Sequence, residues 1–273
     1  MDHFERSGLR FKVLDSGPAD GAAVVLLHGF PQLPSCYDGV AQRLNDAGLR
    51  TLVPTQRGYS PRASPRRRRD YRIAELTNDV VALLDAAGVE QAHIVGHDWG
   101  GALAWAMGGW HPDRAASLVV LSTPHPAAMV DAFRHSDQAL RSTYMGFFQL
   151  PLLPEVIGRR LLAKGLRDTG LPEQYVKTYV YAMADPGAMT GALNWYRGIP
   201  FSIRESVGRI RVPTTYVWGR HDVALNRYAA EATAKFVTGP YEFVDLDANH
   251  WLPETEPDAV AEAVIKRVES SGT

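Results

Sequence analysis

The chain has a single cysteine, Cys36, in 273 residues, so an intramolecular disulfide is excluded. A lone thiol is typical of a protein from a reducing compartment, and we expect the cytoplasm. Long apolar runs are also absent, since no segment approaches the roughly 18 apolar residues that suggest a membrane span. The charged N-terminus lacks the apolar core of a secretory signal. These absences predict a protein with no membrane partner.

The chain also has no large excess of positive or negative charge. The chain has 29 Lys and Arg against 30 Asp and Glu, a formal net charge of -1, so nothing favours a nucleic-acid partner. Its one dense basic run, 66–69, is flanked by Ser64, Pro65 and Asp70. We interpret this run as a solvated loop and not as a binding patch.

Short apolar runs alternate with helical patterns through the first two-fifths of the chain. Nearly continuous apolar character predicts buried strands over 22–29, 49–55, 92–96 and 115–122. Apolar residues at helical spacing predict helices over 40–48, 72–89 and 99–112, the last stopped by Pro112. Strands alternating with helices imply a parallel sheet with helices on its faces.

The pattern changes after Thr123. Residues 124–208 contain amphipathic stretches without a clear buried strand, and the alternation resumes with strands over 214–219 and 241–246 and helices over 226–237 and 257–268. We therefore predict a core domain of residues 1–123 and 209–273, with a helical cap of residues 124–208 inserted into it. Such a cap would cover the carboxyl edge of the sheet, where open α/β sheets bind ligands.

A tight turn joins the predicted strand 92–96 to the helix that follows it. Its sequence, "GHDWGG", places Asp98 between Gly96 and Gly100, where small residues let strand and helix approach closely. This is the pattern of a nucleophile elbow with a carboxylate in place of the usual serine. The helix N-terminus favours a negative charge at Asp98, and backbone N–H groups at that end stabilise an oxyanion.

Two more polar side chains follow predicted strands. Asp222 comes after the strand 214–219, and His250 comes after the last strand, so the chain order is nucleophile, acid, histidine. Asp222 could orient the imidazole of His250 and stabilise its charged form. Alternatively, Asp222 is a turn residue and His250 is a packed loop histidine.

Five strings, "LLHGFP", "QRGYSP", "GHDWGG", "GRHD" and "NHW", occur in this order. The chain resembles the α/β-hydrolase superfamily, and within it the epoxide hydrolases and haloalkane dehalogenases, which use an aspartate nucleophile. The resemblance implies a mostly parallel central sheet flanked by helices, with an inserted helical cap. It also implies an oxyanion hole formed by the backbone N–H groups of Phe30 and Trp99. It implies no cofactor and no metal.

An aspartate nucleophile restricts the reaction. Asp98 is ionised at neutral pH and needs no base in order to attack. Attack on an acyl carbon would give an anhydride, whereas attack on a saturated carbon with a leaving group gives a stable alkyl ester. Water activated by His250 then cleaves that ester. We therefore expect an epoxide or an alkyl halide as substrate.

The leaving group separates these two substrates. A halide requires N–H donors, whereas an epoxide oxygen leaves as an alkoxide and requires a proton donor such as a phenol. The resemblance assigns that role to tyrosines in two strings of the predicted cap. "YMGFFQ" supplies Tyr144 and "LNWYR" supplies Tyr196. The alternative is that both are core aromatic residues at helical spacing.

The sequence therefore predicts an epoxide hydrolase that forms a vicinal diol through an alkyl ester on Asp98. The substrate would be a small apolar epoxide, because the predicted cap is rich in Met, Phe, Tyr and Trp. Two alternatives stay open: a haloalkane or haloacid dehalogenase with the same nucleophile, and a non-catalytic ligand-binding protein of the same fold. The protein would be a monomer or a homodimer.

Overall fold

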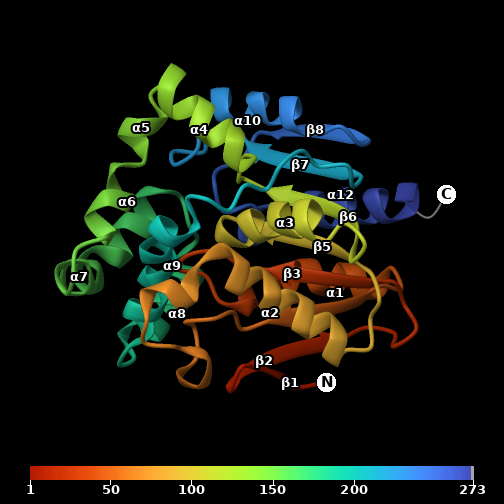
Figure 1. Ribbon diagram of the computed structural model, residues 1–273, viewed down its shortest axis with the longest axis horizontal. Helices are drawn as coiled ribbons and strands as arrows, with labels where there is room; N and C mark the ends of the chain where they lie inside the picture. The colour runs from red at the N-terminus through yellow and green to blue at the C-terminus, as the bar shows by residue number, and fades with distance from the viewer. Residues whose placement is uncertain (272–273) are drawn as a thin grey trace.

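An eight-stranded sheet forms the centre of the computed structural model, which describes residues 1–271 (Figure 1). The strand order is β1-β2-β4-β3-β5-β6-β7-β8, and all pairs from β4 to β8 are parallel. The strands are β1 (His3–Arg6), β2 (Leu9–Ser16), β3 (Ala23–Leu27), β4 (Arg50–Pro54), β5 (Ala92–His97), β6 (Ala115–Leu121), β7 (Thr214–Gly219) and β8 (Tyr241–Leu246). This arrangement confirms the predicted fold class.

The antiparallel hairpin of β1 and β2 was not predicted from the sequence. Ser7 and Gly8 form its turn with φ of +52° and +76°, a combination that suits a two-residue hairpin loop. The rings of Phe4 and Phe11 stack across it with centroids 4.7 Å apart. The hairpin joins the parallel strands because β2 pairs antiparallel with β4.

Helices cover both faces of the sheet (Figure 1). On one face lie α2 (Ile73–Ala86) and α3 (Trp99–Trp110), and on the other lie α1 (Asp38–Asp46) and α12 (Pro257–Ser271). Neighbouring residues of the central strands point to opposite faces: Val25 packs in the core under α2 and α3, and Val24 in the core under α1 and α12. Burial on both faces explains the continuous apolar runs of these strands.

Six helices connect β6 to β7, and within residues 124–208 the structure has no strand. They are α4 (Pro126–His135), α5 (Gln138–Arg141), α6 (Thr143–Phe148), α7 (Leu153–Asp168), α8 (Glu173–Ala184) and α9 (Ala188–Ser202). Helices α6 to α9 gather at one end of the sheet, and α4 lies beside α10 (Arg227–Ala232) (Figure 1). The amphipathic stretch 129–148 is divided among α4, α5 and α6, because Ser136 has extended backbone angles.

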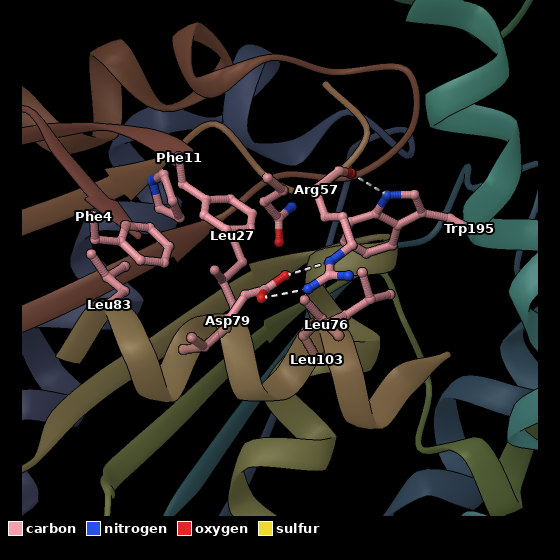
Figure 2. A pocket seen from close by; sticks show the side chains of 12 residues that line it. Phe4, Phe11, Leu27, Arg57, Leu76, Asp79, Leu83, Leu103 and Trp195 are labelled. Atoms are coloured by element: carbon pink, nitrogen blue, oxygen red, sulfur yellow. Dashed lines mark hydrogen bonds and ion pairs between the residues drawn. The ribbon is translucent and has the colours of Figure 1, made fainter. Parts of the chain in front are cut away.

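Helix α9 is attached to the core by a buried ion pair and a hydrogen bond. Figure 2 shows the guanidinium of Arg57 directed at Asp79 of α2, with both nitrogen–oxygen distances 2.7 Å. The indole of Trp195 on α9 donates to the backbone oxygen of Arg57 at 2.7 Å. The hollow between these side chains measures about 10 Å³, which is too small for a substrate.

No helix in the described part of the chain combines the length and the apolar character that crossing a bilayer requires.

Candidate active site

Asp98 occupies the sharp turn between β5 and α3. Its φ of +52° and ψ of −119° are unusual for a residue with a side chain. Small neighbours allow this turn, since a Cβ on Gly100 would lie 1.9 Å from the backbone oxygen of Leu27, and one on Gly96 would lie 2.0 Å from that of Gly100. The turn points the Asp98 carboxylate away from the sheet, toward the helices that follow β6.

The carboxylate of Asp98 is held by backbone N–H groups. The N–H of Phe30 donates to Oδ1 at 2.8 Å. Burial raises the pKa of Asp98, while the charge of His250 and the N–H groups of Phe30 and Trp99 lower it. The structure thus brings the two predicted oxyanion donors to the same carboxyl group.

His250 and Asp222 meet beside Asp98. Nδ1 of His250 lies 2.7 Å from Oδ2 of Asp222, whose other oxygen accepts the backbone N–H groups of Ala224 and Leu225. Because Nδ1 faces a carboxylate, it carries a proton, and Nε2 faces Oδ2 of Asp98 at 3.9 Å. Burial opposes the charge on His250, but Asp222 and Asp98 outweigh it and raise the pKa of His250 to about 9.

Tyr144 and Tyr196 line the same cavity as Asp98. Tyr144 comes from α6 and Tyr196 from α9, and their ring centroids are 5.9 Å apart. Burial raises the pKa of Tyr144 and raises that of Tyr196 well above its usual value, so both phenols keep their protons at neutral pH. Both tyrosines border the cavity of the carboxylate.

The two strings that contain these tyrosines are bonded to each other. Nε2 of Gln149 donates to the backbone oxygen of Tyr196 at 2.8 Å. Arg197 donates to the backbone oxygens of Phe148 and Leu150 at 2.9 and 2.6 Å, and its charge is paired with Glu155. Gln149 and Arg197 thus fix α6 against α9, which fixes the distance between the phenols.

The cavity beside Asp98 has a volume of about 290 Å³ and mostly apolar walls. Its apolar side chains come from α2, α3, α4, α6, α9 and the segment after β7, and include Ile73, Ala102, Met129, Phe133, Met145, Ile199 and Leu225. Within residues 1–271, no group of three or more His, Cys, Asp or Glu side chains is placed to hold a metal ion. The polar side chains that line the cavity include those of Asp98, Tyr144, Tyr196 and Thr123. The hydroxyl of Thr123 donates to the backbone oxygen of Asp98 at 2.7 Å.

Sequence reasoning missed a group of polar residues behind the site. Gln32, His97 and Glu254 are buried and bonded to one another, and each lies within four residues of Phe30, Asp98 or His250. The available signal was their position in or shortly after the recognised strings: His97 lies in "GHDWGG", Gln32 directly follows "LLHGFP" and Glu254 follows "NHW" by three residues.

Comparisons with known proteins agree with this geometry. The family model for the alpha/beta hydrolase fold matches residues 22–257. The AB hydrolase superfamily protein YfhM of Bacillus subtilis is 34% identical over 95% of this chain and 94% of its own length. Epoxide hydrolase A of Mycobacterium tuberculosis is 32% identical over 96% of this chain and 95% of its own length. The crystal structure of epoxide hydrolase A from Mycobacterium thermoresistibile covers 98% of this chain and 97% of its own, with a TM-score of 0.86 at 28% identity. The chain therefore belongs to the α/β-hydrolase fold family, in the branch that includes the epoxide hydrolases.

Proposed function

We propose that the protein is an epoxide hydrolase, which adds water to an epoxide to give a vicinal diol. One observation carries the proposal: a buried carboxylate and two protonated phenols border a single apolar cavity. A carboxylate supplies a nucleophile for saturated carbon, and phenols supply the proton that an alkoxide requires. Relatives named epoxide hydrolases, in bacteria and vertebrates, support the same activity.

In the first step, Asp98 attacks one epoxide carbon. Its carboxylate oxygen forms a bond to that carbon while the carbon–oxygen bond of the ring breaks. Tyr144 and Tyr196 bind the epoxide oxygen, and one of them transfers its proton to it. The product of this step is a hydroxyalkyl ester of Asp98.

In the second step, water attacks the carboxyl carbon of that ester. His250 takes a proton from the water through Nε2, and Asp222 stabilises the resulting imidazolium. The N–H groups of Phe30 and Trp99 stabilise the oxyanion that forms on the carboxyl group. When this intermediate collapses, the bond from the carboxyl carbon to the alkyl oxygen breaks, and the proton left on the attacking oxygen passes to the leaving alkoxide. The diol is released and the Asp98 carboxylate is restored. The proton that His250 took from water replaces the one that the tyrosine gave up in the first step.

The substrate that the cavity favours is a small apolar epoxide. The cavity has a volume of about 290 Å³ and mostly apolar walls, so it fits an epoxide whose substituents are compact and apolar. Residues 124–208 would act as the cap, because they supply both tyrosines and several of the walls. The proposed location of the protein is the cytoplasm, because its one cysteine, Cys36, is a free and buried thiol, as is typical of a reducing compartment.

The test is an activity panel of terminal, disubstituted and aryl epoxides, with small haloalkanes and haloacids alongside and Asp98→Ala as the blank. We expect diol formation by the unmodified protein and none by the variant. In His250→Gln, an epoxide should leave a stable adduct on Asp98 that intact-protein mass spectrometry detects. Halide release without diol would establish the dehalogenase alternative, and saturable binding without adduct would establish a ligand-binding protein.

A further inference from the structure

A buried hydrogen-bonded network, here called the rear network, lies behind the proposed active site. It consists of Gln32, His97, Glu254 and Tyr179. His97 directly precedes the proposed nucleophile, Gln32 follows Phe30 by two residues and Glu254 follows His250 by four. All four side chains are buried, and the proposed mechanism uses none of them.

Both ring nitrogens of His97 face oxygen atoms. Nε2 lies 2.7 Å from the backbone oxygen of His250, and Nδ1 lies 2.7 Å from Oε1 of Gln32. A carbonyl oxygen only accepts hydrogen bonds, so a neutral ring would direct a lone pair at one of the two oxygens. A ring with protons on both nitrogens satisfies both contacts.

Reversing the amide of Gln32 does not remove this constraint. Oε1 also accepts the backbone N–H of Gly29 at 2.7 Å. In a reversed amide, the NH₂ group would face that N–H, and two donors would oppose each other. Because a backbone N–H cannot change its role, Gly29 fixes the orientation of Gln32 and therefore the acceptor that His97 faces.

Glu254 has the contacts of a carboxylate. Its Oε1 accepts both Nε2 of Gln32 and the hydroxyl of Tyr179, each at 2.8 Å. A neutral carboxyl group would carry its proton on Oε2, and that atom is buried without a hydrogen-bond partner for a proton to reach. Burial, together with the charge of His250, lowers the pKa of His97. Burial raises the pKa of Glu254 to about 7, although Gln32 and Tyr179 lower it, so burial favours the neutral pair. The contacts oppose that preference, because a neutral His97 directs a lone pair at one of its two oxygen partners and a neutral Glu254 has no partner for its proton.

We propose that His97 is a doubly protonated imidazolium whose counter-ion is the Glu254 carboxylate, with the Gln32 amide bonded to both. In this arrangement His97 is a positioning residue. It holds the backbone oxygen of His250, which also accepts from Ser122 at 3.0 Å, while Gln32 holds the backbone that leads to Phe30.

The charge of His97 acts on His250, a consequence that rests on the proposed function. The two ring centroids are 4.8 Å apart. A positive charge at that distance disfavours a second one on His250, which must be neutral to act as a base. The other charged or titratable groups around the two rings are Asp98, Asp222, Glu254, His28 and Tyr37. Asp222, Asp98 and the more weakly acting Glu254 favour the charged form of His250. His97 opposes them and keeps the base available once Asp98 is esterified.

The charge state itself can be measured without any substrate. Long-range ¹H–¹⁵N spectra of protein with labelled histidine distinguish a doubly protonated ring from a neutral one, and the signals of His97 are assigned by their loss in His97→Gln. We expect His97 to carry both protons at pH 7. His93, a buried histidine of the same strand, is the internal reference: its Nδ1 bonds to the hydroxyl of Ser117 and burial lowers its pKa, so it should be neutral. A singly protonated His97 in the unmodified protein would overturn the proposal, whatever the activity of the enzyme.

The effect on His250 is read from the pH dependence of kcat on an epoxide that the unmodified protein hydrolyses. Gln32→Leu should neutralise His97, and the acid limb of kcat should move to higher pH by about one unit. Glu254→Gln should move it in the same direction but less, because this variant also removes the Glu254 charge, which itself raises the pKa of His250. Tyr179→Phe is the matched control, since it removes one contact of Glu254 and leaves the Gln32 bridge intact. Loss of kcat in the two variants without a shift of the limb would show a merely structural role and would contradict this part of the inference.

Discussion

At the scale of single residues, the site pairs groups whose charges stabilise one another. Burial raises the pKa of Asp98, and His250 with two backbone N–H groups lowers it. Asp98 and Asp222 together raise the pKa of His250 to about 9. Esterification of Asp98 would remove one of these two negative charges, so the pKa of His250 would fall when the proposed mechanism requires a base.

The two phenols provide a prediction at this scale. Tyr144→Phe and Tyr196→Phe should each lower the rate of ester formation by about 10²-fold, at the lower end for general acid catalysis because the second phenol remains. The double variant should lose more than either single one. Rapid-quench measurement of the Asp98 adduct gives this rate separately from its hydrolysis. Tyr181→Phe, at a tyrosine of α8 that is 81% exposed, is the control and should change nothing. Equal effects at all three tyrosines would contradict the assigned role.

At the scale of elements, the strand-to-helix turn sets the geometry of the nucleophile. Helix α3 approaches β5 so closely that a Cβ on Gly96 would lie 2.0 Å from the backbone oxygen of Gly100, and it approaches the neighbouring strand β3 so closely that a Cβ on Gly100 would lie 1.9 Å from that of Leu27. Asp98 can hold its unusual backbone angles only while this contact persists, since such angles are stable only where the surroundings impose them.

Two glycines test the turn by direct comparison. Gly100→Ala would place a Cβ 1.9 Å from the backbone oxygen of Leu27 and should destabilise the protein by about 3 kcal/mol or more. Gly165→Ala, in the last turn of α7 with nothing within 4 Å of the added carbon, should stabilise it by up to about 0.5–1 kcal/mol. Urea unfolding measures both changes. A tolerated Gly100→Ala would show that the turn is not held by close packing.

Much of the core was predictable at this scale because its strands are buried on both faces. The runs over 22–29 and 115–122 contain β3 and β6, the run over 92–96 covers β5 except for His97, and the turn at Asp98 was recognisable from its glycines. Strand β2 was missed because one of its faces is exposed, so its apolar residues alternate and form no run. The residues of the rear network lie in or near recognised strings, but their pairing was not predicted, because the hydrogen bond from Gln32 to Glu254 joins residues 222 positions apart.

At the scale of the whole molecule, the helices after β6 depend on the core for their placement. Trp195 is bonded to the backbone of Arg57, and Arg57 is held by Asp79 of α2. Asp79 also accepts from Arg6 of the N-terminal hairpin at 2.8 Å. This one carboxylate therefore connects the hairpin, α2 and the loop under α9.

Asp79→Asn should be costly, because it leaves the buried charge of Arg57 without its partner. The expected loss is about 3–5 kcal/mol of unfolding free energy, as for other broken buried pairs. Glu231→Gln is the control: it removes an exposed pair with Arg227, and we expect a change below about 0.5 kcal/mol. Urea titrations should show a lower midpoint for the first variant at an unchanged slope. Similar losses in both variants would contradict the account of the ion pair.

The covalent ester is the central claim, and a single turnover in H₂¹⁸O tests it most directly. With enzyme in excess over an epoxide that it hydrolyses, water attacks the carboxyl carbon and not the epoxide carbon. The released diol should therefore contain no ¹⁸O, and the peptide that carries Asp98 should gain it, as mass spectrometry of both would show. A labelled diol with an unlabelled Asp98 would mean direct attack by water and would contradict the account.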